Sequence, residues 1–178
     1  DFSNHQFEKN NDLSTKGFIE NKKSRFREHT WSNGDVYFGD WVSDVKTGKG
    51  KYSWANGNIY DGDWVSDVRT GKGKFSWPNG DIYEGDFVAG VITGKGKLMW
   101  VRGDVLRIYE GDFVESKRTG KGTYTKANGD ILAAYEGDFV AGEKTGKGKY
   151  TGPRGDKYEG DWLAGKKTGK GKYTGCSG

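Results

Sequence analysis

Several kinds of residue are scarce in this sequence, and each scarcity excludes something. The 178 residues include one cysteine, so no disulfide can form within the chain, and only two histidines and two prolines. No run approaches the roughly 20 apolar residues that a membrane-spanning helix needs. With 32% hydrophobic residues and a mean hydropathy of -0.92, the chain also lacks the material for one large aliphatic core.

Glycine and aromatic residues are abundant instead, and they recur in a fixed phrase. The chain holds 31 glycines, and aromatic residues make up 15% of it. A phrase such as Tyr83–Gly96 is repeated at intervals of 23 or 26 residues. Because disordered chains are poor in aromatic residues, we interpret the sequence as a folded repeat protein with a thin aromatic core. The repeats begin at Tyr37, Tyr60, Tyr83, Tyr109, Tyr135 and Tyr158.

Each repeat contains two segments whose residues alternate with a period of two. In residues 81–88 the tyrosine, glycine and phenylalanine share one parity, while Ile82, Glu84, Asp86 and Val88 share the other. Residues 71–77 alternate in the same way, with lysine opposite glycine and aromatic residues. This alternation predicts strands with one buried face. Glycine beside an aromatic residue on that face leaves a shallow slot for a ring.

The connections between these segments predict hairpins. Asn56-Gly57 and Asn79-Gly80 stand between strand-like segments, which is the strongest short-range hairpin signal. The longer link at residues 89–94 carries glycines where positive φ angles are needed. We therefore predict an all-β fold, an elongated single-layer antiparallel meander with an aromatic-glycine groove. Each hairpin depends on its neighbours, as in other repeat proteins.

The repeats divide the chain into three parts. Residues 37–178 hold the six repeats. Residues 17–36 follow the same pattern weakly, with Arg25 and Arg27 in place of glycines and His29 in place of a tyrosine. We predict that they form a degenerate capping repeat, since terminal repeats are often atypical. Residues 1–16 are polar, and we predict a flexible lead-in.

The phrase resembles the MORN repeat, whose pattern is Tyr-x-Gly-x-Trp/Phe-x-x-Gly-x-x-x-Gly-x-Gly. The third unit matches this pattern at Tyr83, Gly85, Phe87, Gly90, Gly94 and Gly96. Three units depart from it, because Asp44, Asp67 and Ser116 stand where the others have Gly90, Gly142 or Gly165. Aspartate tolerates left-handed φ angles better than most residues, so we expect Ser116 to mark a different loop.

The resemblance implies a non-enzymatic scaffold that binds a protein segment in its aromatic groove, with peripheral contact to anionic phospholipid as a further role. It also implies that such repeats occur as regulatory appendages of larger enzymes. A cytoplasmic location, with peripheral attachment to a membrane or the cytoskeleton, is the corresponding expectation. The groove residues are expected to be Tyr60, Trp64, Tyr83, Phe87, Tyr109, Phe113, Tyr135 and Phe139.

Signals of catalysis are missing from the sequence. His5 and His29 lie in the part that repeats poorly, and Cys176 has no histidine placed to activate it. The recurring Gly-Lys-Gly-Lys is not a phosphate-binding loop, which needs Gly-x4-Gly-Lys-Ser/Thr between a strand and a helix. We therefore expect no enzyme activity, no cofactor and no metal.

The charges are patterned although the net charge is only +4. The polar positions of one strand-like segment carry acidic residues, and those of the neighbouring segments carry lysines. This arrangement predicts a solvated ladder of cross-strand pairs. Basic residues also recur in the link between strands, where they could follow an anionic surface such as lipid headgroups or simply form a solubilising rim. Nucleic acid is a weaker option, because acidic residues are interleaved. The basic positions are Lys46, Arg69, Lys117, Arg118, Lys144, Lys166 and Lys167.

Two alternatives stay open. Short hairpin repeats rich in aromatic residues, glycine and lysine also occur in modules that bind choline or cell-wall saccharides, although these have another spacing and no Thr-Gly-Lys-Gly. In addition, the last strand, around Tyr173, has no following segment in this sequence to cover its edge. An uncovered edge can pair with another chain, so we predict a weak homodimer through this strand.

Overall fold

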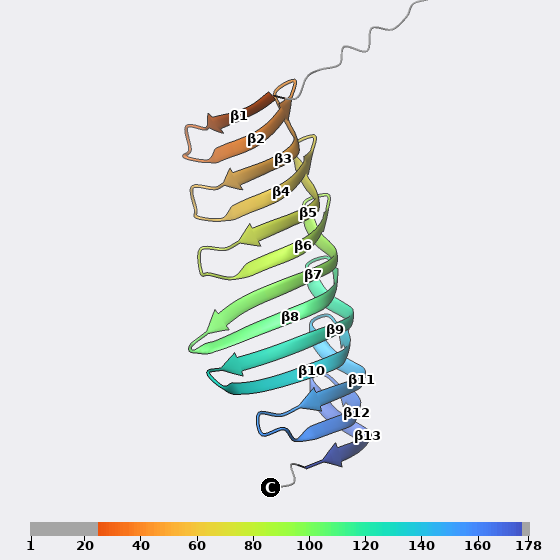
Figure 1. The fold of residues 1–178 in the computed structure, drawn as a ribbon. Helices are drawn as coiled ribbons and strands as arrows, with labels where there is room; N and C mark the ends of the chain where they lie inside the picture. Colours follow the sequence, from red (N-terminus) through yellow and green to blue (C-terminus); the bar gives the residue numbers. More distant parts are fainter. Residues whose placement is uncertain (1–24, 176–178) are drawn as a thin grey trace, which may run out of the picture.

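The molecule is a single open sheet of antiparallel strands stacked in sequence order (Figure 1). A computed structural model describes residues 25–175. Its 13 strands each pair only with their neighbours in sequence, and these residues contain no helix. Both the all-β class and the single-layer meander are confirmed. The strands are β1 Arg25–Thr30, β2 Val36–Val42, β3 Val45–Ser53, β4 Ile59–Val65, β5 Val68–Ser76, β6 Ile82–Val88, β7 Val91–Arg102, β8 Val105–Val114, β9 Lys117–Asn128, β10 Ile131–Val140, β11 Glu143–Thr151, β12 Lys157–Leu163 and β13 Lys166–Thr174.

The core is a row of aromatic rings on one face of this sheet. Tyr83 is fully buried and Phe87 is 2% exposed, although a single layer has no second sheet to cover them. The rings cover one another: Phe87 meets Tyr83 and Tyr60 edge to face, with centroids 5.3 and 5.0 Å apart. Each phenylalanine or tryptophan thus joins its own repeat to the preceding one, and the core runs unbroken along the sheet.

Glycines make room for the tyrosines of this core. Gly85 and Gly96 pair directly across β6 and β7, and the Tyr83 ring lies over them. The Tyr83 hydroxyl donates a hydrogen bond to the Asp86 carbonyl at 3.1 Å, so the buried oxygen is satisfied. The same bond recurs in every repeat, to the residue three positions after the tyrosine.

A bulge at the same point of each hairpin bends the strands. Across β6 and β7 one residue, Asp86, faces three, Thr93 to Lys95. Gly94, at φ +103°, supplies the left-handed backbone that this needs. Figure 1 shows the result, in which the strands curve and their far ends turn behind the sheet.

Two-residue turns lie where the sequence suggested the longer link, and two more, at residues 103–104 and 129–130, lie at the other end of the sheet. Val88 and Val91 are joined by a two-residue turn, with Ala89 at φ 48° and Gly90 at φ 82°. The predicted longer link at residues 89–94 was therefore wrong, because Val91 already begins β7. The Asn56-Gly57 and Asn79-Gly80 pairs lie instead in wider loops, such as the one that the Trp77 amide closes on the Asp81 carbonyl at 2.9 Å.

Ser116 does not mark a different loop. Its φ is 64°, close to the 66° of Asp67 in the equivalent turn. Its amide donates to the Ile92 carbonyl at 2.9 Å, just as the Gly90 amide donates to the Arg69 carbonyl at 2.8 Å. The turn geometry and this bond between repeats hold serine in a left-handed conformation that it rarely adopts alone.

At the N-terminal edge, β1 pairs with β2 in the register that β3 uses with β4. His29 stands opposite Tyr37 as Tyr52 stands opposite Tyr60. The His29 ring packs edge to face on Trp31, with centroids 4.5 Å apart. Residues 25–36 thus form the second half of a repeat unit. The rest of the predicted cap, residues 17–24, and the lead-in at 1–16 lie outside the described residues.

Candidate functional site

The aromatic face presents a second set of rings that are only partly buried. They lie beside the buried core, on strands and loops at the end of the sheet opposite to turns such as Ala89-Gly90. Accessible tryptophan and tyrosine rings give a surface the large apolar contact area that protein interfaces favour. The set consists of Trp31, Tyr52, Trp54, Trp77, Trp100, Tyr124 and Tyr150, with Ile92 and Leu98 in the middle repeats.

The eight residues expected to line the groove are the core itself. Their exposed fractions run from 0% for Tyr60, Tyr83 and Tyr109 to 4% for Trp64. Side chains buried to this degree hold the face together and leave a partner almost no surface to touch. Their packing on one face agrees with the alternation of the sequence, but the accessible rings are those of the partly buried set. The other four are Phe87, Phe113, Tyr135 and Phe139, each at 1 or 2%.

A row of cations lies on the same face as these rings. Each stands directly opposite the core tryptophan or phenylalanine of its own hairpin, as Arg69 does opposite Trp64. The third repeat has Ile92 at this position. We call this set the cation row: Lys46, Arg69, Arg118, Lys144 and Lys167.

Arg69 shows how the row is held. Its guanidinium carbon lies 5.2 to 5.8 Å from the ring centroids of Trp54, Tyr60, Phe75 and Phe87. It also donates to the Gly90 carbonyl, in the next turn, at 2.9 Å. Burial lowers the pKa of this side chain below its usual value. The rings and the carbonyl thus fix a desolvated cation on the aromatic face.

The other cations of the row are held by an ion pair, by a carbonyl or by rings. The Lys46 side chain is 13% exposed, and its ammonium lies 2.7 Å from Oδ1 of Asp67. Arg118 repeats the Arg69 arrangement, with a bond of 2.7 Å to the Gly142 carbonyl. Lys144 lies among four rings at 4.6 to 5.7 Å.

The seven basic residues predicted to form one edge therefore lie on two different surfaces. Lys117 and Lys166 are exposed beside the tight turns, as expected for an edge. The remaining five positions point onto the aromatic face instead. The sequence assigned them to a loop, but the two-residue turn places residue i+5 opposite the core aromatic at i. That constant offset of five residues was the signal that could have located them.

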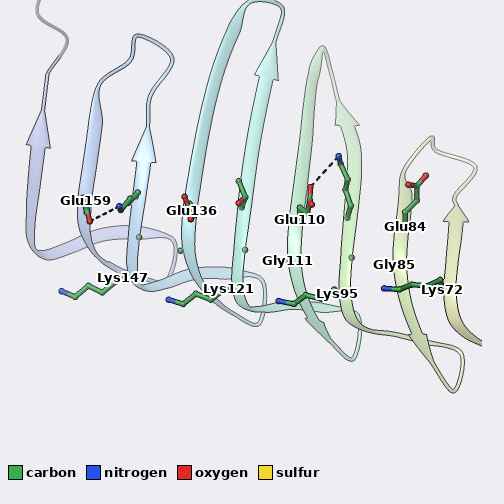
Figure 2. Close-up of a pocket in the computed structure, with 17 residues that line it drawn as sticks. Lys72, Glu84, Gly85, Lys95, Glu110, Gly111, Lys121, Glu136, Lys147 and Glu159 are labelled. Atoms are coloured by element: carbon green, nitrogen blue, oxygen red, sulfur yellow. Dashed lines mark ion pairs between the residues drawn. The ribbon is translucent and has the colours of Figure 1, made fainter.

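The opposite face carries a groove lined by charge. It has a volume of about 970 Å³ and crosses the hairpins from β5 to β12. Paired glycines such as Gly85 and Gly96 lie along it. Figure 2 shows Lys72, Lys95, Lys121 and Lys147 extending in the same direction from successive hairpins, with Glu84, Glu110, Glu136 and Glu159 in a second row.

The lysines of this charged groove are mostly neutralised. Lys72 lies 2.6 Å from Asp86, and Lys121 lies 2.5 Å from Asp138 in the following hairpin. The bond from Lys72 is the main cause that lowers the pKa of the Asp86 carboxyl, and the Lys121 bond does the same for Asp138. The predicted ladder of cross-strand pairs thus exists. Equivalent pairs join Lys95 to Asp112 and Lys147 to Asp161, both at 2.5 Å.

The family to which these repeats belong follows from their sequence match. The MORN repeat model matches residues 37–59, 60–82, 83–105, 109–131, 135–157 and 158–178. The chain belongs to the MORN-repeat family. No curated protein matches it. MORN repeats are generally non-catalytic modules, found in proteins that contact membranes or other proteins. None of the described residues belongs to a helix that could cross a membrane.

Proposed function

We propose that this MORN-repeat chain is a non-enzymatic scaffold that binds an elongated segment of a protein partner along its aromatic face. The observation that carries the proposal is the combination of partly exposed rings with the cation row, continued over successive repeats. Tryptophan, tyrosine and arginine are the residues that dominate binding energy at protein interfaces. The face follows the stacking direction, so it suits an extended partner.

The rigidity of this face favours binding. Arg69 and Arg118 are each fixed by a carbonyl in the next turn and by surrounding rings. A side chain that is already ordered loses little conformational entropy when a partner binds. By contrast, the lysines of the charged groove end at solvent, and that of Lys147 is 77% exposed.

The alternatives fit the geometry less well. A choline site needs an empty aromatic cage, but the cages on this face hold the chain's own cations. Anionic lipid would contact exposed lysines, and those of the charged groove already face aspartates. Lys117 and Lys166 are the exposed exceptions, so contact with phospholipid headgroups is the second candidate.

Peptide selection tests the proposal. A displayed peptide library would be selected on the whole chain, and the selected peptides would be titrated against variants of each face. We expect Trp100→Ser to weaken them by about tenfold, the loss typical of a ring that anchors an interface. Lys95→Ser, in the charged groove, is the matched control and should leave binding unchanged.

Two results would contradict the proposal. One is that selected peptides depend on Lys95 and ignore Trp100. The other is that no peptide binds, while phosphatidylserine vesicles bind the wild type and lose binding with Lys117→Ser and Lys166→Ser. The homodimer remains a separate proposal, supported by Tyr173, which is 64% exposed on the edge strand β13. Sedimentation of the wild type against Tyr173→Pro tests it.

A further inference from the structure

One residue of the cation row, Lys46, is paired with a carboxylate of the chain itself, that of Asp67. This pair shows how a carboxylate binds on the aromatic face. Oδ1 of Asp67 lies 2.7 Å from the Lys46 ammonium and accepts a hydrogen bond from the Lys46 amide at 3.1 Å. Asp67 occupies the second position of the tight turn in the following hairpin. Its own amide donates to the Lys46 carbonyl at 3.0 Å, which fixes the turn against the cation.

Later repeats keep this geometry but lack the acid. Gly165 occupies the position of Asp67, and its amide donates to the Lys144 carbonyl at 3.0 Å. A Cβ at Gly165 would meet nothing within 4 Å, so the space that the aspartate fills beside Lys46 is open beside Lys144. Gly142 holds the same turn position beside Arg118, but there the guanidinium itself lies 3.4 Å from a Cβ built on the glycine and donates to its carbonyl at 2.7 Å.

Lys144 is left with rings and cations around it. Its ammonium lies 4.6 Å from the Tyr135 centroid and 5.2 Å from that of Trp162. Within residues 25–175 this ammonium makes no hydrogen bond and no ion pair to a protein group. Burial lowers its pKa, and the charges of Arg118 and Lys167 lower it further, with no acidic group acting in the other direction. A desolvated ammonium without a counter-ion is costly, and a carboxylate that reaches it offsets part of that cost.

We propose that Arg118, Lys144 and Lys167 form a binding site for the carboxylates of an acidic protein segment, with the space over Gly165 as its central position. This rests on the proposed function and gives the partner's chemistry. The ammonium of Lys144 is recessed among rings, so a projecting side chain reaches it better than the flat surface of a bilayer. Lys167, bound to the Tyr173 hydroxyl at 2.7 Å, forms the outer end.

The spacing of the site sets the spacing of the acids. Arg118, Lys144 and Lys167 lie on β9, β11 and β13, so consecutive cations are separated by two strands, or roughly 9.6 Å. A peptide in the polyproline II conformation covers roughly 9.3 Å in three residues, and its three residues per turn return every third side chain to the same face. A segment with glutamate at every third position can therefore place one carboxylate at each cation.

A synthetic peptide that repeats Glu-Leu-Ser, labelled with fluorescein, tests this by anisotropy on the whole chain. We expect it to bind about tenfold more tightly than the same peptide with glutamine. Gly165→Asp places an internal carboxylate where Asp67 stands beside Lys46, so it should reduce that preference to near unity. Gly165→Asn is the matched control: it has the same shape, tolerates a left-handed turn and should keep the preference. Circular dichroism checks that both variants fold.

The remaining outcomes are decisive. If Gly165→Asp and Gly165→Asn bind the acidic peptide equally, the site is not at Lys144 and the proposal fails. It also fails if phosphatidylserine vesicles bind in a way that Gly165→Asp abolishes while the peptide does not bind. If the glutamate and glutamine peptides bind equally and Trp100→Ser weakens both, the scaffold function holds and only the acid site is lost.

Discussion

At the residue scale, a single methyl group decides whether a hairpin can hold its tyrosine. A Cβ built on Gly96 would lie within 2.5 Å of three atoms of the Tyr83 ring and hydroxyl. Tyr83 is fully buried and its hydroxyl is bonded to the Asp86 carbonyl, so it cannot move aside without losing both. Glycine is therefore required here by space, although its φ is not left-handed.

We expect Gly96→Ala to destabilise the chain by about 2 kcal/mol, the usual cost of overpacking a core. The measurement is the urea midpoint followed by circular dichroism. Gly175→Ala is the control, because nothing lies within 4 Å of a Cβ there and its φ is not left-handed. Equal midpoints for the two variants would show that Tyr83 does not lie across the glycines.

The tyrosines also predict how the fold responds to alkali. Burial raises the pKa of Tyr60 to about 12, and burial does the same for Tyr83 and Tyr109. Since the folded pKa lies above the unfolded value of 10.0, the stability that these groups give is complete below pH 10. It is lost as the pH rises from 10 toward 12.

We therefore expect tyrosinate absorbance and loss of strand circular dichroism to rise together in this window. The part of the tyrosinate signal that Tyr83→Phe removes should share its midpoint with the strand signal, because the neutral ring is what the core accommodates. If that part appears at pH 10 with the strand signal intact, the Tyr83 hydroxyl is accessible in the folded state.

At the element scale, one aspartate per hairpin joins the bulge of its own hairpin to the strand that precedes it. Oδ2 of Asp86 accepts the Lys95 amide at 2.9 Å, inside the bulge, and Oδ1 lies 2.6 Å from the Lys72 ammonium of the preceding hairpin. The bulge bends the strands, and the bend brings Tyr83 and Phe87 together. The carboxylate thus supports the core from the opposite face.

Asp86→Ala should cost about 1 kcal/mol, because it leaves the Lys95 amide without its acceptor and removes a partly exposed ion pair. Glu136→Ala is the control on the same face: Glu136 stands opposite Thr123 and Lys149, Lys149 pairs with Glu159, and Glu136 has no ion pair within the described residues. Urea denaturation of both variants is the measurement. The aspartate has no such role if both are neutral.

The bulge is the part of the hairpin that the sequence did not predict. Alternation and recurrence predicted the strands, their pairing and the buried set, because both follow from residue type alone. The bulge could not be predicted, since Thr-Gly-Lys-Gly reads equally well as a loop. A link over residues 89–94, and its equivalents in the other repeats, places Lys46 and Arg69 on an edge. They lie in strands, opposite Trp41 and Trp64.

At the scale of the whole molecule, every strand contacts its sequence neighbours and the sheet has no crossover. Repeats with the same period are therefore interchangeable in register. Deleting residues 60–82 joins Ile59 to Tyr83, which restores the Ile82-Tyr83 junction and lets Phe87 take the place of Trp64 over Tyr37.

We expect this deletion variant to fold, with a circular dichroism spectrum like that of the wild type and a lower urea midpoint. Deleting residues 71–82 removes most of β5 and reverses the direction of the following strands relative to β4, so that variant should lose cooperative unfolding. If both deletions behave alike, the register between repeats does not specify the fold.

The unbroken order from β1 to β13 also fixes the response to mechanical force. The strands lie side by side along the length of the sheet, with their hydrogen bonds parallel to that length. Tension applied between β1 and β13 therefore acts along these hydrogen bonds. The bonds of one hairpin then break one after another, and the load never falls on a whole strand in shear. We expect such a chain to yield at low force in steps of one repeat and to re-form by adding hairpins to the remaining sheet.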